Sequence, residues 1–142
     1  MPKVKESSEQ SFLTVAIDTR NGLQYLVDAG AGSHTIYSMG ILAGFCLEMA
    51  LKASLMQSGY SVRKVRSYGH NIESLWKEAA INSQINDEIP DWAQCIAKHH
   101  DQPYQYRYPG HQVGVGIKDP EKLPGELEKI IRPLILKSEY LF

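Results

Sequence analysis

The chain has 142 residues, of which 43% are hydrophobic and 22% are charged. These values are typical of one folded domain with a buried core, and they exclude an intrinsically disordered chain. With 15 basic and 16 acidic residues the formal net charge is -1, which argues against a protein that binds polyanions by overall charge. Two cysteines, Cys46 and Cys95, are too few for a disulfide scaffold or a four-cysteine zinc site.

The sequence carries no signal for export or for membrane insertion. The first ten residues, MPKVKESSEQ, lack an apolar signal core. No uninterrupted apolar run reaches the roughly 18 residues that a membrane-spanning helix requires. We therefore expect a cytoplasmic protein with no membrane partner, and we expect the polar residues 1–8 to be frayed.

Two long helices are expected in the first half of the chain. Over Gln10–Ala29, apolar residues recur at spacings of three and four, which is typical of an amphipathic helix. A second helix, capped by Ser33 and extending to Ser58, is apolar on almost every side in its middle. A helix without a wide polar face has neighbours all round, so this helix is predicted to be the centre of a small bundle.

Shorter elements follow. A basic loop over Tyr60–Gly69 is predicted to precede a third helix, Ile72–Ala80, which Asn71 can cap. A fourth helix is predicted over Asp87–His100, with Pro90 in its first turn.

The last part of the chain combines an irregular segment with a helix. Pro103–Pro120 is rich in tyrosine, glycine and proline, although the alternation over Val113–Ile117 would suit a short strand. The final helix is predicted over Pro120–Leu141, with Pro133 kinking or splitting it. The sequence therefore predicts one all-α domain over residues 1–142, an up-and-down bundle of four to five helices with an irregular loop before the last.

Glu48 and Lys52 lie four residues apart on the most apolar helix. One interpretation is a pair of polar groups that project into a cleft. Spacing alone favours the other, an ordinary ion pair between successive turns from which Lys52 extends to solvent. Cys46 on the same helix is expected to be an inert core residue rather than a nucleophile.

The basic loop brings Arg63, Lys64 and Arg66 close to His70. Together with the backbone amides at the start of the third helix, such a loop can receive a phosphate. The alternative is a solvated loop, in which His70 only caps the helix or packs against it.

The segment Tyr104–Gly110 holds three tyrosines that alternate with polar residues around Arg107. Aromatic faces and a guanidinium can stack bases and hold phosphates. The alternative is structural: the rings close the end of the bundle, and Arg107 pairs with an acid such as Glu48 or Asp101.

Neither a metal nor a cofactor is expected. His99 and His100 point about 100° apart on a helix, so the two do not easily bind one ion, and His111 lies further along the chain. No HExxH, CxxC, P-loop, GxGxxG or GxSxG motif is present in the sequence.

Three segments, in this order, resemble the HEPN superfamily (higher eukaryotes and prokaryotes nucleotide-binding). They are ILAGFCLEMALKASL at 41–55, GHNIESLW at 69–76 and YRYP at 106–109, within a resemblance that covers roughly residues 10–137. The resemblance implies an up-and-down helical bundle that forms a homodimer. The superfamily includes metal-independent endoribonucleases of toxin–antitoxin and antiphage systems, partners of nucleotidyltransferases, and non-catalytic binders of nucleotides or nucleic acid.

In active members, four to six residues separate an arginine from a histidine late in the bundle, and the two motifs meet across the dimer. Here three residues separate Arg107 from His111. Six residues separate Arg63 from His70, but this pair precedes the third helix, where the sequence resembles the GH segment of the family. By resemblance, Glu48 matches the polar residue of an earlier helix, and Arg107 matches the functional arginine.

Three functions are therefore expected, in this order. The first is a HEPN-like module that binds a nucleotide or RNA without a complete catalytic motif, in a toxin–antitoxin or antiphage system. Its ligand-binding candidates are Glu48, Lys52, Arg66, His70, Tyr104, Arg107 and Tyr108. The second is an interaction subunit that pairs with a nucleotidyltransferase. The third is a metal-independent endoribonuclease in which Arg107 stabilises phosphate charge, while His70 or His111 moves the proton of the ribose 2′-OH.

Overall fold

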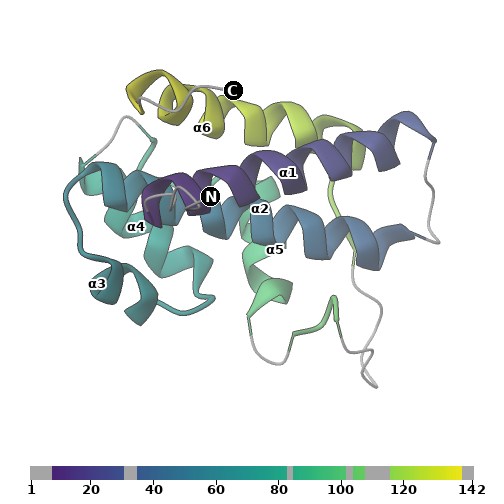
Figure 1. The fold of residues 1–142 in the computed structure, drawn as a ribbon. Helices are drawn as coiled ribbons and strands as arrows, with labels where there is room; N and C mark the ends of the chain where they lie inside the picture. The colour runs from purple at the N-terminus through teal and green to yellow at the C-terminus, as the bar shows by residue number, and fades with distance from the viewer. Residues whose placement is uncertain (1–7, 31–34, 83–84, 102–103, 108–115, 139–142) are drawn as a thin grey trace, which may run out of the picture.

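The structure is a computed structural model that describes residues 8–30, 35–82, 85–101, 104–107 and 116–138. All regular structure in these ranges is helical, which confirms the predicted all-α bundle (Figure 1). The elements are α1 (Ser8–Asp28), α2 (Ile36–Gln57), α3 (Val62–Ser67), α4 (Ile72–Asn82), α5 (Asp91–His100), the 3₁₀-helix η2 (Pro120–Lys122) and α6 (Leu123–Lys137).

Helix α2 lies at the centre of the bundle and packs against each of the other five α-helices. In Figure 1, α1 runs beside α2 along its length, α6 covers this pair on one side, and α3, α4 and α5 lie on the other side. Almost every residue of α2 from Met39 to Leu55 is buried or half-buried. The expectation that the most apolar helix is the central one is therefore confirmed, because its neighbours cover it on all sides.

The segment predicted as a basic loop contains helix α3. The Ser61 hydroxyl accepts a hydrogen bond from the Lys64 amide at 3.1 Å and caps the helix, and Val65 is fully buried. A capping serine and one apolar anchor are enough to order a short turn against the bundle. The three cations of this segment remain, but they lie on a helix and are exposed.

Several predicted helix boundaries are wrong. The fourth helix begins at Asp91, four residues later than expected, because Pro90 adopts an extended conformation (φ −65°, ψ 156°) and occupies the N-cap position. The last helix follows the η2 turn and continues through Pro133 to Lys137, so the predicted split does not occur. Asn71 caps α4 as predicted, since its Oδ1 accepts a hydrogen bond from the Ser74 amide at 3.0 Å.

Helix α2 begins at Ile36 with Thr35 at its N-cap position, so the helix start predicted at Ser33 is wrong. Ser8, expected to be frayed, is the first residue of α1. The predictions for residues 1–7 and for positions 113–115 fall outside the described residues. Gly116 and Ile117, at the end of the predicted strand-like piece, are described and are not in a strand.

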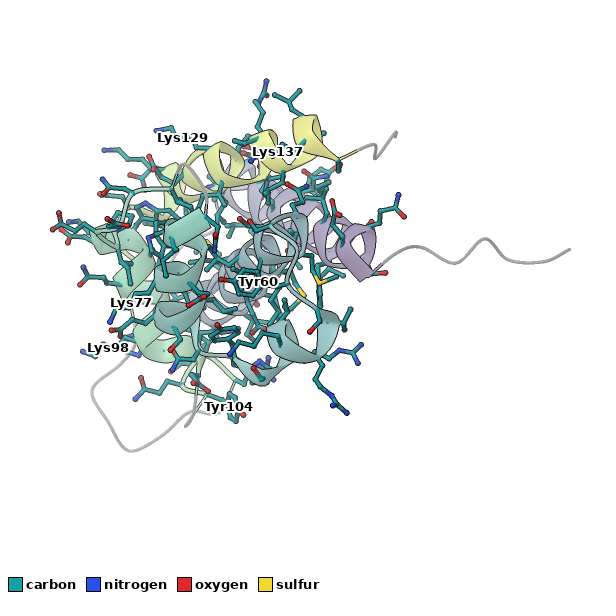
Figure 2. The ribbon with its side chains drawn as sticks, turned by 90° about the vertical axis from the view of Figure 1, so that its left-hand side faces the viewer. Tyr60, Lys77, Lys98, Tyr104, Lys129 and Lys137 are labelled. Carbon is teal, nitrogen blue, oxygen red and sulfur yellow. The ribbon has the colours of Figure 1, made fainter. Side chains whose placement is uncertain are left out.

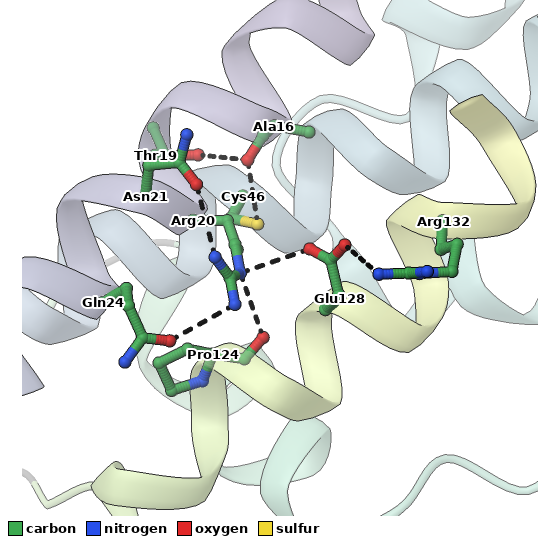
Figure 3. A network of polar contacts seen from close by, with 9 residues as sticks. All are labelled: Ala16, Thr19, Arg20, Asn21, Gln24, Cys46, Pro124, Glu128 and Arg132. Carbon is green, nitrogen blue, oxygen red and sulfur yellow. Dashed lines mark hydrogen bonds and ion pairs between the residues drawn. The ribbon is translucent and has the colours of Figure 1, made fainter.

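Arg20 joins the first helix to the last (Figure 3). Its Nε donates to the Pro124 carbonyl and pairs with Glu128, both at 3.3 Å. Beside it, the Cys46 thiol donates to the Ala16 carbonyl at 3.3 Å, and burial raises the pKa of Cys46 to about 12. A thiol with this pKa stays protonated at neutral pH, which agrees with the expectation of an inert core cysteine.

By length and apolar composition alone, α2 could cross a membrane. The core helix of a soluble protein meets the same criterion, and 72% of the most apolar window of α2 is buried within the protein. The helix is therefore only weak evidence for a membrane span.

Gly40 allows the ring of Tyr106 to pack directly on α2. A Cβ at this position would lie 2.2 Å from Tyr106 Cδ1, which is far inside van der Waals contact. The ring is 2% exposed, and its hydroxyl donates to the Gly116 carbonyl at 3.2 Å. Tyr106 is therefore part of the core and holds the chain that follows α5 against α2.

We expect Gly40→Ala to lower the free energy of unfolding by about 1–3 kcal/mol, because the ring and backbone must move apart. The matched control is Gly22→Ala on α1, whose Cβ would meet Leu42 Cδ1 at an ordinary 3.6 Å. This control should be neutral or stabilising by up to about 1 kcal/mol. Urea denaturation followed by circular dichroism measures the free energy of unfolding of both variants. Equal values for Gly40→Ala and Gly22→Ala would contradict the packing of Tyr106 on Gly40.

Candidate functional site

One face of α2 positions the candidate site. Gly40, Gly44, Glu48 and Lys52 recur every four residues and therefore lie along one face of the helix, and all four are buried. The two glycines provide space for rings from outside α2, and the two charged residues supply polar groups. The four-residue spacing is visible in the sequence, but nothing in the sequence shows that the two glycines receive rings from other parts of the chain.

The Glu48 carboxylate is the centre of the site, and the residue is 1% exposed. Its Oε1 lies 2.7 Å from His100 Nε2 and 2.9 Å from His70 Nδ1. Its Oε2 accepts a hydrogen bond from Lys52 Nζ at 2.9 Å. For both imidazoles to donate to Oε1, the protons must lie on His100 Nε2 and His70 Nδ1.

These partners decide the ionisation of Glu48. Burial by itself would raise the pKa of Glu48, but the hydrogen bonds from His100, Lys52 and His70 and the charge of Lys52 outweigh it. The pKa of Glu48 is consequently lowered from 4.5 to about 2. The carboxylate is therefore ionised at neutral pH although it is buried.

The Glu48–Lys52 ion pair predicted from spacing is present, but the expectation that Lys52 extends to solvent is wrong. The Lys52 side chain is only 8% exposed. Because neighbouring helices surround α2, Lys52 has no short route to water, and its ammonium group stays on Glu48 Oε2. The pair belongs to a buried polar cluster and is not an ordinary surface pair.

The two histidines come from distant parts of the chain. His100 is the last residue of α5 and is 4% exposed. It fits against α2 only because residue 44 is glycine, since a Cβ there would lie 2.2 Å from His100 Nδ1. His70 lies just before α4, and its side chain is 38% exposed. The two rings meet edge to face, with centroids 5.9 Å apart.

Arg107 lies on two aromatic faces. Its guanidinium carbon is 4.6 Å from the centre of the Phe45 ring and 5.4 Å from that of Tyr104. Its Nη2 is enclosed and has no hydrogen-bond partner in the described part of the chain. No ion pair joins Arg107 to Glu48 or Asp101 within these residues, so the rings hold the guanidinium in place of an acid.

Tyr104 completes the site. Its backbone has φ 57°, a left-handed conformation that is uncommon for tyrosine, in a tight turn where Arg107 N donates to Tyr104 O at 2.9 Å. Its ring meets the His70 ring edge to face, with centroids 5.9 Å apart. Ring and cation–π contacts therefore form a closed circuit through Phe45, His100, His70, Tyr104 and Arg107, and two of its members, His70 and His100, contact the Glu48 carboxylate. We name the whole group the Glu48 cluster, which consists of Phe45, Glu48, Lys52, His70, His100, Tyr104 and Arg107.

The structure brings most predicted site residues together. Arg66 is an exception, because it is exposed on α3 and has no described contact with the cluster. Of the two interpretations of the Tyr104–Gly110 segment, the structural one holds for Tyr106, whose ring is in the core and whose pKa burial raises well above its ordinary value. Tyr108 and His111 lie outside the described residues.

An open groove of about 890 Å³ runs along α4 and α5 beside the cluster. Asn71 and Asp101, which line it, directly follow His70 and His100 in the chain. Its charged lining is mixed in sign and consists of Glu73, Lys77, Asp87, Asp91, Lys98, Asp101 and Lys118. In Figure 2, Lys77 and Lys98 project on one side of the molecule, and Tyr104 lies at the end remote from α6. The groove is not a basic path for a polyanion.

The structure also assembles a set of metal-binding groups. One ligand atom from each of Glu48, His70 and His100 lies within 4.8 Å of the others. His99 points elsewhere, as the helical angle predicted, and its ring packs on Tyr106 with centroids 5.4 Å apart. Sequence spacing does not reveal this combination, because His70 and His100 lie 22 and 52 residues from Glu48 along the chain.

Comparison with known proteins provides no independent identification. No family model, no curated protein and no solved structure matches this chain. The resemblance to HEPN proteins therefore stays a prediction based on three sequence segments.

We expect the depressed pKa of Glu48 to make folding sensitive to acid. Its stabilising effect is fully present above the unfolded-state value near 4.5 and is lost as the pH falls towards about 2. The difference between the unfolded-state and folded-state pKa values of Glu48 corresponds to about 3 kcal/mol of folding free energy. Urea unfolding at a series of acidic pH values should show a smaller loss of stability in Glu48→Gln than in the wild type.

The matched control is Glu73→Gln. Glu73 pairs with Lys77 at the same spacing and the same 2.9 Å, but its side chain is 63% exposed. This variant should keep the pH dependence of the wild type, because exposed pairs contribute little. If the stability of Glu48→Gln depended on pH as that of the wild type does, the acid sensitivity of folding could not be assigned to Glu48.

Proposed function

We propose that the chain binds a nucleotide or RNA through a phosphate group at the Glu48 cluster. The observation that carries the proposal is the position of Arg107, whose guanidinium rests on Phe45 and Tyr104 and whose Nη2 has no hydrogen-bond partner among the described residues. A planar guanidinium offers several donors that match phosphate oxygens. Stacking on two rings orients the group before any ligand arrives, which reduces the entropy lost on binding.

His70 is the second contact in this proposal. Glu48 holds its Nδ1, and the half-exposed ring leaves Nε2 as the nitrogen available to a ligand. Arg107 and Lys52 contribute two positive charges to the cluster, and Glu48 contributes one negative charge. The net charge of the cluster is therefore positive even without the two histidines, and it attracts an anion. Tyr104 supplies an aromatic surface on which a base can stack.

The partners expected from the HEPN resemblance remain predictions. These are a second copy of the chain in a homodimer and a nucleotidyltransferase that pairs with it. The toxin–antitoxin or antiphage setting is a prediction of the same kind. Each is independent of whether a phosphate binds at Arg107, so a binding experiment tests the proposal alone.

Fluorescence anisotropy with labelled RNA, and competition by ATP, measure the proposed binding. We expect saturable, salt-sensitive binding that Arg107→Ala weakens by about ten- to a hundredfold, which corresponds to the loss of charge-assisted hydrogen bonds. Arg107→Lys should be intermediate, because it keeps the charge but loses the planar donors. The control is Arg132→Ala, since Arg132 is an exposed arginine on α6 paired with Glu128.

No saturable binding of either ligand would remove the proposal. Equal affinities of Arg107→Ala and Arg132→Ala would also contradict it, because binding would then occur elsewhere. Circular dichroism of each variant separates a lost contact from a lost fold.

A second candidate function, a metal-independent endoribonuclease, is favoured by one observation. Glu48 Oε1 lies 2.9 Å from His70 Nδ1, an arrangement in which a carboxylate orients a histidine for proton transfer. In such a reaction His70 Nε2 takes the proton of the 2′-OH as its oxygen attacks phosphorus. The bond from phosphorus to the 5′ oxygen breaks, the departing 5′ oxygen takes a proton from water, and Arg107 stabilises the charge on the phosphate, which remains as a 2′,3′-cyclic phosphate.

This candidate predicts RNA cleavage in the presence of a chelator, with cyclic phosphate ends. His70→Ala and Arg107→Ala should each slow cleavage by about a hundredfold or more, and Arg132→Ala should leave it unchanged. Electrophoresis of end-labelled RNA measures the rates. Cleavage by both site variants at the wild-type rate would exclude the enzyme assignment.

A further inference from the structure

We propose that Glu48, His70 and His100 form a binding site for Zn²⁺. One ligand atom from each residue lies within 4.8 Å of the others, and Glu48 Oε1 contacts both His70 Nδ1 and His100 Nε2. Two imidazoles and one carboxylate, with a fourth position open, are a set of ligands that zinc adopts in proteins. The inference does not rest on the proposed function, since an ion can bind with or without a nucleotide.

The distances are close to those that zinc needs. Zinc binds nitrogen and oxygen at about 2.0–2.2 Å, so neighbouring ligand atoms in a tetrahedral site are about 3.3 Å apart. Here the two separations from Oε1 are 2.7 and 2.9 Å, slightly shorter than this value, and the ligand nitrogens of the two histidines lie within 4.8 Å of each other. Zinc would replace the two N–H···O contacts, and small outward movements of the rings would admit it.

Each imidazole must present a lone pair to the ion, so its proton has to lie on the other ring nitrogen. For His70 this is Nε2, on a side chain that is 38% exposed. For His100 it is Nδ1, which faces α2 at Gly44. The buried His100 and Glu48 thus provide a fixed side of the site, and the half-exposed His70 provides the side from which an ion enters.

Lys52 determines how the carboxylate binds. Its ammonium group occupies Glu48 Oε2 at 2.9 Å, which leaves Oε1 as the single oxygen that can ligate. It also opposes a cation by charge. Zinc suits this site better than Mg²⁺ or Ca²⁺, because those ions prefer sets of oxygen ligands and two of the three ligands here are nitrogen.

Isothermal titration of the chelator-treated protein with Zn²⁺ tests the inference directly. We expect one ion per chain and a higher melting temperature with zinc. The site variant is His70→Gln, whose half-exposed position keeps the core intact. It should weaken binding by at least about a hundredfold, since even the loss of a group behind a ligand costs ten- to a hundredfold. The matched control, His99→Gln, changes the histidine next to His100 and should bind as the wild type does.

Two further measurements make the test specific. Co²⁺ in place of zinc should give the intense visible absorption of a four-coordinate site, and His70→Gln should abolish it. Lys52→Gln should tighten zinc binding by about tenfold, because it removes the opposing charge. Absence of stoichiometric zinc binding, or equal loss of affinity in His70→Gln and His99→Gln, would overturn the inference. Zinc binding in a protein that binds no RNA or ATP would uphold it while removing the proposed function.

Discussion

The site depends on the Glu48 carboxylate, which is 1% exposed on the most apolar helix of the protein. An ionised group in such a place is very unfavourable unless polar partners surround it. Lys52, His70 and His100 supply these partners, and the two histidines lie 22 and 52 residues away along the chain. Satisfying one carboxylate therefore fixes the start of α4 and the end of α5 against α2.

Glycine makes this arrangement sterically feasible. Gly44 lets His100 reach the carboxylate, and one helical turn earlier Gly40 admits the Tyr106 ring. With Tyr106 in the core, the turn after α5 places Arg107 over Phe45. The contacts that stabilise the fold thus also orient a guanidinium and a half-exposed imidazole at one end of the molecule. For this reason the same few side chains are the basis of both proposed sites, one for a phosphate and one for zinc.

Local signals predicted the helices well where they were strong. The central position of α2 followed from its apolar surface, and the start of α4 followed from the Asn71 cap, which the structure confirms. Prediction failed where the local signal was weak or where burial against another helix was needed as well. Helix α3 needs Ser61 and the buried Val65 to form, and α5 starts only after the extended Pro90. Sequence spacing also detected the Glu48–Lys52 pair but not its burial.

The sequence by itself determined the all-α class, the central helix, the i,i+4 ion pair and the residue types available for a site, because helical periodicity and capping act over a few residues. Only the tertiary structure decided that Glu48 bonds to His70 and His100, that Phe45 and Tyr104 hold Arg107, and that Tyr106 is in the core. Those contacts join segments whose relative positions depend on how the helices pack around α2, and no local pattern specifies that packing.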